Sequence, residues 1–311
     1  MVHTAEYTHK VRLSDELYGA KFVLNRNNKN LQVTIPPRAK DGIKIKLTNA
    51  LSITDGSPGD IIIQIQVAPR PVLNPAAGTN IDSIFQFCLY TIGGIDNAHV
   101  KNYLDSRNKA IYRQLFFEKA VGAIWVAGWG AKQCNTFLAK APQYGFDWNF
   151  SSLALWSDSQ LTQFMHRMHP KSVRGRARQK WEAVHKIAKW LNGFQNECDF
   201  RQRVFRNVLL GRNLDKQDVA ALRDFKLSYI GEANAFYVVR MLGGEEIKDD
   251  RWIKEFREWA NLSFYQLESL LDTYKIPRGF FDVVMWEYCN MFIGEVSKLK
   301  PHFQSQFGFL A

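Results

Sequence analysis

Hydrophobic and polar residues alternate along the first seventy positions of the chain. The pattern is clearest at residues 31–35 and 43–47, and residues 61–67 follow it. A period of two residues is typical of half-buried β-strands. Asn-Asn and Asp-Gly pairs between these segments indicate turns. We therefore expect a small all-β domain over residues 1–70.

A change of composition follows this region. Residues 69–80 are rich in proline, glycine and small side chains, as in linkers between domains, so we expect a linker at residues 71–80. Beyond it the alternation disappears and apolar residues recur at helical spacing, for example within residues 113–141 and 173–191. The pattern predicts an all-α domain over residues 81–311 and an α+β fold class for the whole chain.

The charge of the chain indicates a class of partner. A chain of 311 residues is long enough for two domains, and its net charge of +11 favours a polyanion such as DNA or RNA. The basic residues are concentrated between Arg167 and Arg212, where twelve Lys and Arg accompany three acids. Charge alone does not distinguish nucleic acid from a ribosomal or membrane surface.

Several functional classes find no support in the sequence. It contains no run of eighteen apolar residues and no apolar signal core at the N-terminus, so we expect neither a membrane span nor a membrane partner. The four cysteines are far apart and form no C-x-x-C pair. His166, His169 and His185 lack the spacing of a metal site, so we expect no metal and no cofactor. Sparse cysteines are typical of the reducing cytoplasm.

Residues 218–256 contain the most informative motif. A helical segment over residues 219–225 meets a short turn at 226–231, and a second helical segment begins at Glu232. Gly231 leaves the first N–H groups of that helix free to bind phosphate. An acidic pair, Asp249 and Asp250, follows after a short loop.

This order resembles the helix-hairpin-helix signature of the DNA glycosylase superfamily, whose hairpin of the type L-P-G-V-G grips backbone phosphate. In residues 227–231 (LSYIG), Ile230 and Gly231 match the last two positions, whereas Tyr229 stands at the first glycine. Residues 173–191 are similar to the basic helix of the superfamily, and the resemblance covers about residues 110–295. It implies DNA contacts by Lys226, Ser228, Ile230, Gly231, Arg174, Arg176 and Arg178.

The resemblance also implies a catalytic residue. Cleavage of an N-glycosidic bond builds positive charge on the sugar, which a nearby carboxylate stabilises. In the superfamily this aspartate lies at the start of the helix after the hairpin, where this chain has Asp250, with Asp249 as the alternative. Either aspartate can instead be a helix N-cap. Bifunctional members carry a lysine at the position of Ala233, so the resemblance implies an enzyme without lyase activity.

A glycosylase has to turn the target base out of the duplex before it reaches the bond. Trp129, in the glycine-rich break AGWGAKQ, lies where members of the superfamily place wedge or pocket residues. Gln133 and Tyr229 are further candidates for this role. Packing in the core is the alternative for Trp129.

The N-terminal region resembles a different family. Residues 13–22, 33–47 and 59–67 are similar to the C-terminal substrate-binding domain of DnaJ-type chaperones. The J domain and its cysteine-rich zinc region are absent, which argues against stimulation of an ATPase. The resemblance implies a β domain that binds an extended peptide or a protein partner, or one that braces the helical domain or extends its DNA surface.

Together these patterns predict a monofunctional DNA N-glycosylase. It would excise a damaged or modified base from double-stranded DNA and leave an abasic site. An enzymatically hypermodified base of phage DNA, removed in host defence, belongs to the same substrate class. The alternatives are a DNA-binding protein without catalysis and a chaperone-like adaptor.

Overall fold

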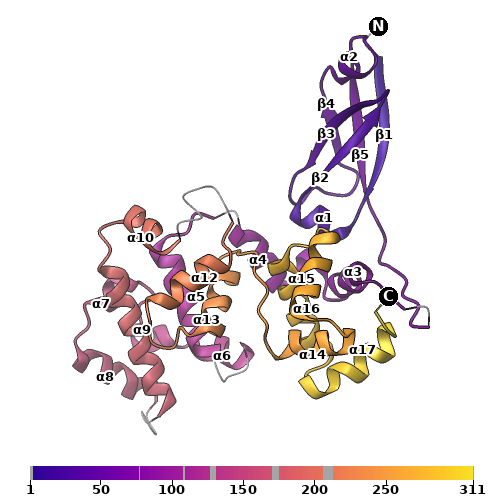
Figure 1. Cartoon of the computed structure of the whole chain (residues 1–311). Coiled ribbons are helices and arrows are strands. Elements are labelled where there is room, and N and C mark those ends of the chain that lie inside the picture. The colour runs from indigo at the N-terminus through magenta and orange to yellow at the C-terminus, as the bar shows by residue number, and fades with distance from the viewer. Residues whose placement is uncertain are drawn as a thin grey trace. The chain divides into compact units, whose positions relative to one another are not determined.

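A small N-terminal sheet region precedes a mostly helical part, as the α+β expectation requires (Figure 1). The computed structural model describes residues 3–76, 78–107, 109–126, 131–169, 175–205 and 213–310. Its contacts divide the chain into two compact units. The first unit comprises Met1–Leu104 and Arg251–Ala311, and the second comprises Asp105–Asp250. These bounds differ from the boundary expected at residues 71–80.

The sheet region contains two small sheets. In the first, β5 (Gly59–Val67) lies between β1 (His3–Val11), to which it is parallel, and β4 (Lys44–Leu47), to which it is antiparallel. In the second, β2 (Ala20–Arg26) and β3 (Lys29–Ile35) form an antiparallel hairpin. Two short helices, α1 (Leu13–Tyr18) and α2 (Ala50–Thr54), connect these strands.

Alternation explains how the strands form a core. Ile61, Ile63 and Ile65 of β5 are almost completely buried, whereas Gln64 and Gln66, which alternate with them, are exposed. The turn between β2 and β3 consists of Asn27 and Asn28, with φ of 49° and 58°. Asparagine tolerates this left-handed conformation, which two-residue hairpin turns with the natural strand twist require.

The first unit also contains helices that precede the second unit in the sequence and helices that follow it. They are α3 (Ile81–Thr91), the start of α4 (Ala98–Arg107), α14 (Arg251–Ala260), α15 (Phe264–Thr273), α16 (Arg278–Phe292) and α17 (Leu299–Phe307). Phe85 of α3 contacts the rings of Phe280 and Phe281 on α16, with centroids 5.6 and 5.9 Å apart. These aromatic contacts bury apolar surface where α3 packs against α16.

Polar contacts join the sheet region to these helices. The guanidinium of Arg12, at the end of β1, donates to Asp82 Oδ1 of α3 at 2.9 Å and to the Tyr274 carbonyl after α15 at 2.7 Å. Gln86 of α3 donates to Ser14 Oγ of α1 at 2.7 Å, and both side chains are buried. The first unit therefore contains both the strands and the helices that follow them.

The segment expected to be a linker packs against the C-terminal end of the chain. Thr79 donates through its backbone N–H to the Phe309 carbonyl at 2.9 Å and through its hydroxyl to the Phe307 carbonyl at 3.0 Å. Gly308 has φ of 70°, and a Cβ there would lie 1.8 Å from the Pro75 carbonyl oxygen. Only glycine fits this close approach.

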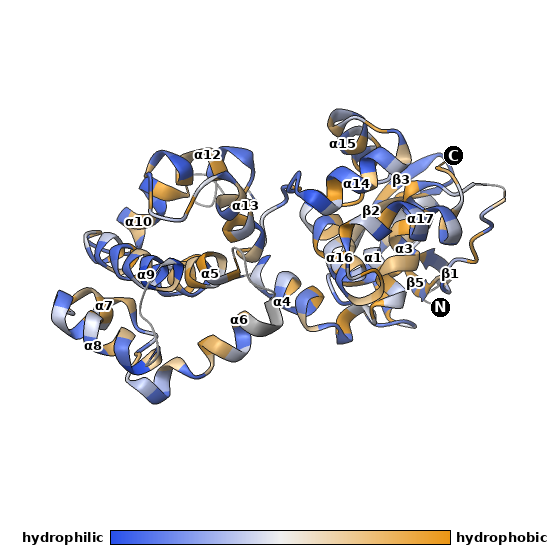
Figure 2. Ribbon diagram, turned by 90° about the horizontal axis from the view of Figure 1, so that it is seen from below, coloured by the Kyte–Doolittle hydropathy of each residue, from blue (hydrophilic) through white to orange (hydrophobic). Residues whose placement is uncertain are grey.

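The second unit is built around α5 (Arg113–Val126) and α9 (Arg176–Asn192). Eight residues of α5 are buried, on all sides of the helix, as is typical of a helix in the middle of a core. Figure 2, coloured by hydropathy, shows α5 beside α9. Within the described part of this unit, α5 and α9 are accompanied by α6 (Ala131–Leu138), α7 (Phe150–Ala154), α8 (Asp158–Met168), α10 (Glu197–Val204), α12 (Lys216–Asp224) and α13 (Glu232–Met241). The described residues also form the 3-10 helices η1 (Gly94–Asp96), η2 (Ala141–Tyr144) and η3 (Val296–Lys298).

The described helices also bear on membrane insertion. None of them combines the length and the apolar character that crossing a membrane requires.

Candidate nucleic-acid interface

The second unit contains a helix–turn–helix hairpin at the position that the sequence indicated. Helix α12 ends at Asp224 and α13 begins at Glu232, so seven residues, 225–231, connect two helices that pack against each other. Leu222 of α12 and Val238 of α13 are fully buried in the core. The hairpin is therefore held by its apolar faces, and its turn is left at the surface.

At position 229 the turn has a left-handed backbone conformation that glycine adopts easily, but the residue is a tyrosine. Tyr229 has φ of 65°, in the left-handed region that a residue with a Cβ rarely adopts. The Ile230 N–H donates to the Leu227 carbonyl at 2.9 Å, and the Asn234 side chain donates to the Tyr229 carbonyl at 2.5 Å. These bonds hold the turn in the conformation that glycine would adopt without strain.

Gly231 forms the N-terminus of α13. It is exposed and extended, with φ of −76° and ψ of −176°, and its position carries no side-chain cap. The N–H groups of the first turn and the helix dipole favour an anion at such a position. Glu232 lies in the same turn, 3.6 Å from a guanidinium nitrogen of Arg223. Arg223 is thus a cation beside the hairpin that the sequence patterns did not single out.

A hydrogen bond connects the turn to the basic helix. The hydroxyl of Tyr229 donates to Gln179 Oε1 at 2.9 Å. Gln179 lies in the first turn of α9 with Arg176 and Arg178, both of which are exposed. Arg178 also pairs with Glu182 at 2.7 Å, which partly neutralises its charge. The structure thus brings the hairpin turn and the start of the basic helix together.

The other candidates for DNA contact have different outcomes. Lys226 is exposed in the turn with φ of 50°, Ser228 is half-buried there, and Ile230 is buried. Arg174 and Trp129 lie outside the described residues. Gln133 is part of α6, but its side chain also lies outside the described part.

The acidic pair lies at the end of the second unit. Asp249 is exposed, whereas the Asp250 side chain is 15% exposed, and α14 begins directly after Asp250. Lys248 Nζ lies 3.8 Å from Asp250 Oδ2, and the Asp250 N–H donates to the Lys248 carbonyl at 2.7 Å. A shielded carboxylate interacts more strongly with charge than an exposed one. Asp250 is therefore the better-placed member of the pair for electrostatic stabilisation.

The loop that carries the acidic pair is anchored to the second unit. The Glu245 N–H donates to the Leu214 carbonyl at 2.9 Å, and the Glu245 carboxylate lies 3.3 Å from a guanidinium nitrogen of Arg107. Ile247 is completely buried. Gly243 has φ of 86°, and a Cβ there would lie 2.6 Å from the Arg107 backbone. These contacts restrict the positions that Asp249 and Asp250 can take.

A buried amine that the sequence patterns missed lies near the break between α5 and α6. Lys180 of α9 is 2% exposed, and its Nζ donates to the Trp125 carbonyl at the C-terminal end of α5 at 3.0 Å. Burial lowers the pKa of the Lys180 ammonium, and the charge of Arg176 lowers it further. A cation at a helix C-terminus offsets the helix dipole, so this contact stabilises the end of α5.

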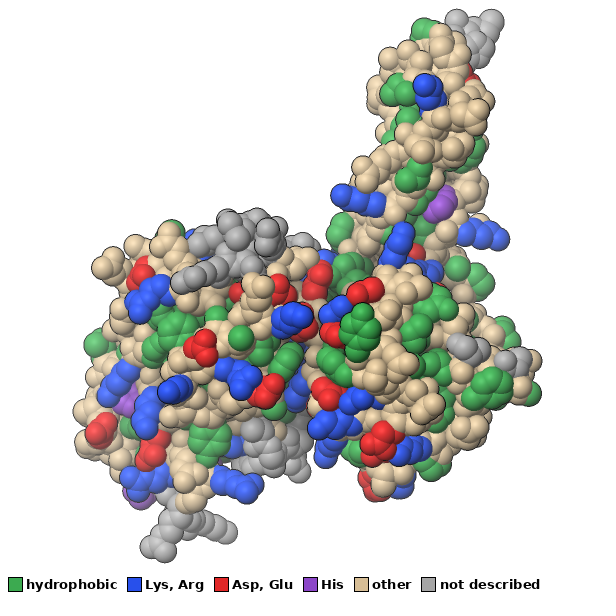
Figure 3. Space-filling view, in the orientation of Figure 1, with side chains coloured by type: hydrophobic (Ala, Val, Ile, Leu, Met, Phe, Trp, Pro, Cys, Tyr) green, Lys and Arg blue, Asp and Glu red, His purple; other side chains and the backbone are tan. Residues whose placement is uncertain are grey.

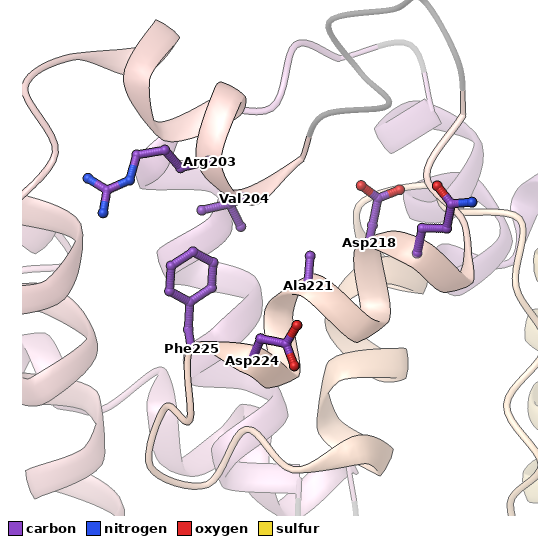
Figure 4. A pocket seen from close by; sticks show the side chains of 7 residues that line it. Arg203, Val204, Asp218, Ala221, Asp224 and Phe225 are labelled. Carbon is purple, nitrogen blue, oxygen red and sulfur yellow. The ribbon is translucent and has the colours of Figure 1, made fainter.

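The second unit also has an open groove of about 430 Å³ between α10 and α12. Phe225 is directed toward Val204 at its apolar centre, while Arg203, Asp218 and Asp224 supply charges (Figure 4). Asp249 and Asp250 are not among the described lining residues. The groove and the acidic pair are therefore separate features.

The charges on the surface are mixed. On the face seen in Figure 3, Lys and Arg side chains are interspersed with Asp and Glu. Among the described residues, no group of His, Cys, Asp and Glu is arranged to hold a metal ion.

Comparisons of the chain with models of protein families, with curated proteins and with solved structures found no significant match in any of the three.

Proposed function

We propose that the chain is a monofunctional DNA N-glycosylase that acts on a damaged or modified base in double-stranded DNA. One observation carries the proposal: the hairpin turn is bonded to the basic helix α9 through Tyr229 and Gln179. The helical part is then a helix-hairpin-helix glycosylase domain, and the sheet region is a β domain similar to the C-terminal domain of DnaJ-type chaperones. The latter can contact a protein partner.

The first step is binding of the DNA backbone. The N–H groups at the start of α13 donate to the oxygens of one phosphate, and Arg176 and Arg178 on α9 contact neighbouring phosphates. These contacts do not depend on the base sequence of the DNA. They hold the duplex while the target nucleotide leaves the base stack. Extrusion is easiest for a damaged or mispaired base, which contributes to selectivity.

Hydrolysis follows at C1′ of the extruded nucleotide. As the N-glycosidic bond breaks, its electron pair leaves with the base, and positive charge develops on the sugar. The Asp250 carboxylate stabilises this charge and orients a water molecule, whose oxygen forms the new bond to C1′. The water loses one proton, the departing base gains one, and the product is an abasic site.

The strand remains uncut on this proposal. A lyase needs an amine that attacks C1′ and forms a Schiff base, and Ala233 offers only a methyl group at the relevant position. Borohydride should therefore trap no covalent complex between protein and DNA. Trapping of a complex would show that another amine, such as Lys226 or Lys248, attacks the sugar.

A screen of base-modified duplexes tests the function. Labelled duplexes would carry an oxidised purine, an alkylated purine or a hypermodified cytosine of the kind that phages install. Alkali should break one strand at the modified base after incubation with the protein, and untreated product should remain intact. Tight duplex binding without any alkali-labile product across the panel would favour the DNA-binding alternative. Negligible DNA affinity at physiological salt would favour the adaptor.

A further inference from the structure

Tyr229 occupies a position in the hairpin whose left-handed backbone conformation is strained for any residue with a Cβ. Its φ of 65° is a conformation that glycine adopts without strain, and the superfamily that the hairpin resembles has glycine there. The turn alone gives no reason for a tyrosine. A bulky residue that persists in a strained conformation indicates that its side chain contributes something else.

The contacts of Tyr229 identify that contribution. Its hydroxyl donates to Gln179 Oε1 on α9 at 2.9 Å, and its carbonyl accepts from Asn234 Nδ2 on α13 at 2.5 Å. Its ring is half-buried and packs against the core of the second unit. One residue therefore contacts the core, the second hairpin helix and the first turn of the basic helix.

We propose that Tyr229 is a positioning residue that fixes the hairpin N–H groups at one separation from Arg176 and Arg178. This inference rests on the proposed function, because it assumes that both elements bind the backbone of one duplex. Phosphates along a DNA strand have a regular spacing, so two protein groups bind them together only when their own separation matches. We call the hydrogen bond between Tyr229 and Gln179 the clamp. Because it sets this separation before DNA binds, less conformational entropy is lost on binding.

Three variants separate the hydroxyl from the turn. Tyr229→Phe removes only the oxygen that bonds Gln179, and Gln179→Leu removes the partner while it keeps a similar volume. Tyr229→Gly restores the residue that suits the left-handed backbone but removes the clamp. Tyr265→Phe is the matched control, because Tyr265 lies on α15 in the first unit and is 79% exposed.

The probe is a duplex of about twenty base pairs that contains a tetrahydrofuran abasic analogue. Its dissociation constant is measured by fluorescence anisotropy at salt concentrations from about 50 to 200 mM, a range over which phosphate contacts are strongly salt-dependent. We expect Tyr229→Phe and Gln179→Leu each to weaken binding about three- to tenfold. The slope of log Kd against log salt should fall by about 0.9, the value of one phosphate contact.

Two further results are expected if the clamp is real. The double variant Tyr229→Phe with Gln179→Leu should bind no more weakly than either single variant, because both remove one interaction. Tyr229→Gly should bind as weakly as Tyr229→Phe, because both variants lack the hydroxyl that bonds Gln179. Tyr265→Phe should bind like the wild type.

The failures of the two proposals are distinguishable. If the wild type binds the probe and all three variants bind equally well with the same salt slope, the positioning role is wrong and the glycosylase proposal is unaffected. Weaker binding with an unchanged slope, in proportion to lost folded protein, would also overturn the clamp and leave only a structural bond. If the wild type neither binds the probe nor produces abasic sites in the base-modified panel, the proposed function itself fails.

Discussion

Asp249 and Asp250 are neighbours in the sequence, yet their surroundings differ. Asp249 is exposed to water, while Asp250 is largely shielded and has the ammonium of Lys248 3.8 Å away. Water screens an exposed carboxylate from charge on a bound sugar, and the shielded carboxylate is screened less. Burial therefore ranks Asp250, the residue that the resemblance implies, ahead of the alternative Asp249.

The ranking leads to a prediction for Asp250→Asn, which removes the charge and keeps the shape. Base excision should fall by at least about a hundredfold, the effect of deleting one electrostatic stabiliser in other active sites. Binding of the abasic duplex should be unchanged. Alkali-labile breaks in a single-turnover assay measure the first quantity. Asp249→Asn is the matched control and should retain activity; the reverse result would make Asp249 the catalyst.

A second residue-level prediction concerns pH and His185. This imidazole is 4% exposed, and burial lowers its pKa, assisted by Lys189, although the Trp156 carbonyl and Asp158 act in the opposite direction. In the unfolded chain the imidazole has its ordinary pKa of about 6.5. Below that pH the unfolded state takes up a proton more readily than the folded state, so folding loses stability as pH falls.

The thermal unfolding temperature should accordingly be lower at pH 5.5 than at pH 7.5. His185→Gln should show a smaller difference between the two pH values, because the glutamine does not titrate. Some dependence should remain, since burial also lowers the pKa of His169 and His302. An undiminished difference in the His185→Gln variant would contradict this assignment.

At the scale of elements, a capping residue places the start of α12 earlier than apolar spacing alone predicted. The expected first helix of the hairpin began at Val219, where the apolar residues begin, but α12 starts at Lys216. Asp215 forms a capping box with Asp218: its side chain accepts from the Gln217 N–H at 2.7 Å, and its own N–H donates to Asp218. The cap stabilises a first turn that has no apolar face.

The loop after α13 leads to a prediction for Gly243→Ala. The added Cβ would meet the Arg107 backbone at 2.6 Å, and φ of 86° is strained for alanine. The free energy of unfolding should fall by about 1–3 kcal/mol, a typical cost of such a backbone conformation. Excision should also slow, because the loop carries the acidic pair.

Urea unfolding of the full chain measures the change in stability. Gly122→Ala is the control: Gly122 lies within α5, and an added Cβ there meets nothing within 4 Å. Alanine in a helix interior is favoured over glycine by roughly 0.5–1 kcal/mol, so this variant should be equally or more stable. Equal stability of Gly243→Ala and the wild type would mean that the loop is not anchored at Arg107.

At the scale of the whole molecule, the chain leaves the first unit after Leu104 and returns at Arg251. The second unit is therefore continuous in sequence, while the first is assembled from both ends. Arg12 and Tyr274, and likewise Thr79 and Phe307, are bonded across most of the chain length. No local composition distinguishes such a docked segment from a linker, which is why residues 71–80 were expected to be one.

This organisation leads to a prediction for Arg12→Met. The variant loses the bonds to Asp82 and to the Tyr274 carbonyl, which link the sheet region to the helices of the first unit, and it also loses two bonds to the Asp15 carboxylate of α1. Bonds to charged groups contribute about 1.5–3 kcal/mol when shielded, and we expect the lower end because the Arg12 side chain is 26% exposed. Chemical unfolding measures the loss, and Lys101→Met, an exposed position on α4, is the control.

The sequence by itself determined the features that depend on neighbours along the chain. The period of two residues predicted β3 and β5, apolar spacing predicted α5 and α13, and Gly231 marked the start of α13. Each of these follows from the burial of one face or from the conformational freedom of one residue. Local patterning is sufficient for them because the residues involved are a few positions apart.

Only the tertiary structure decided which distant groups meet. The bond from Tyr229 to Gln179 spans 50 positions, that from Lys180 to the Trp125 carbonyl spans 55, and that from Arg12 to the Tyr274 carbonyl spans 262. Such pairs form because packing of the helices brings their ends together, and a single sequence contains no periodic trace of that packing. For the same reason the sequence predicted the hairpin and the basic helix as separate elements, and only the fold shows the hydrogen bond between them.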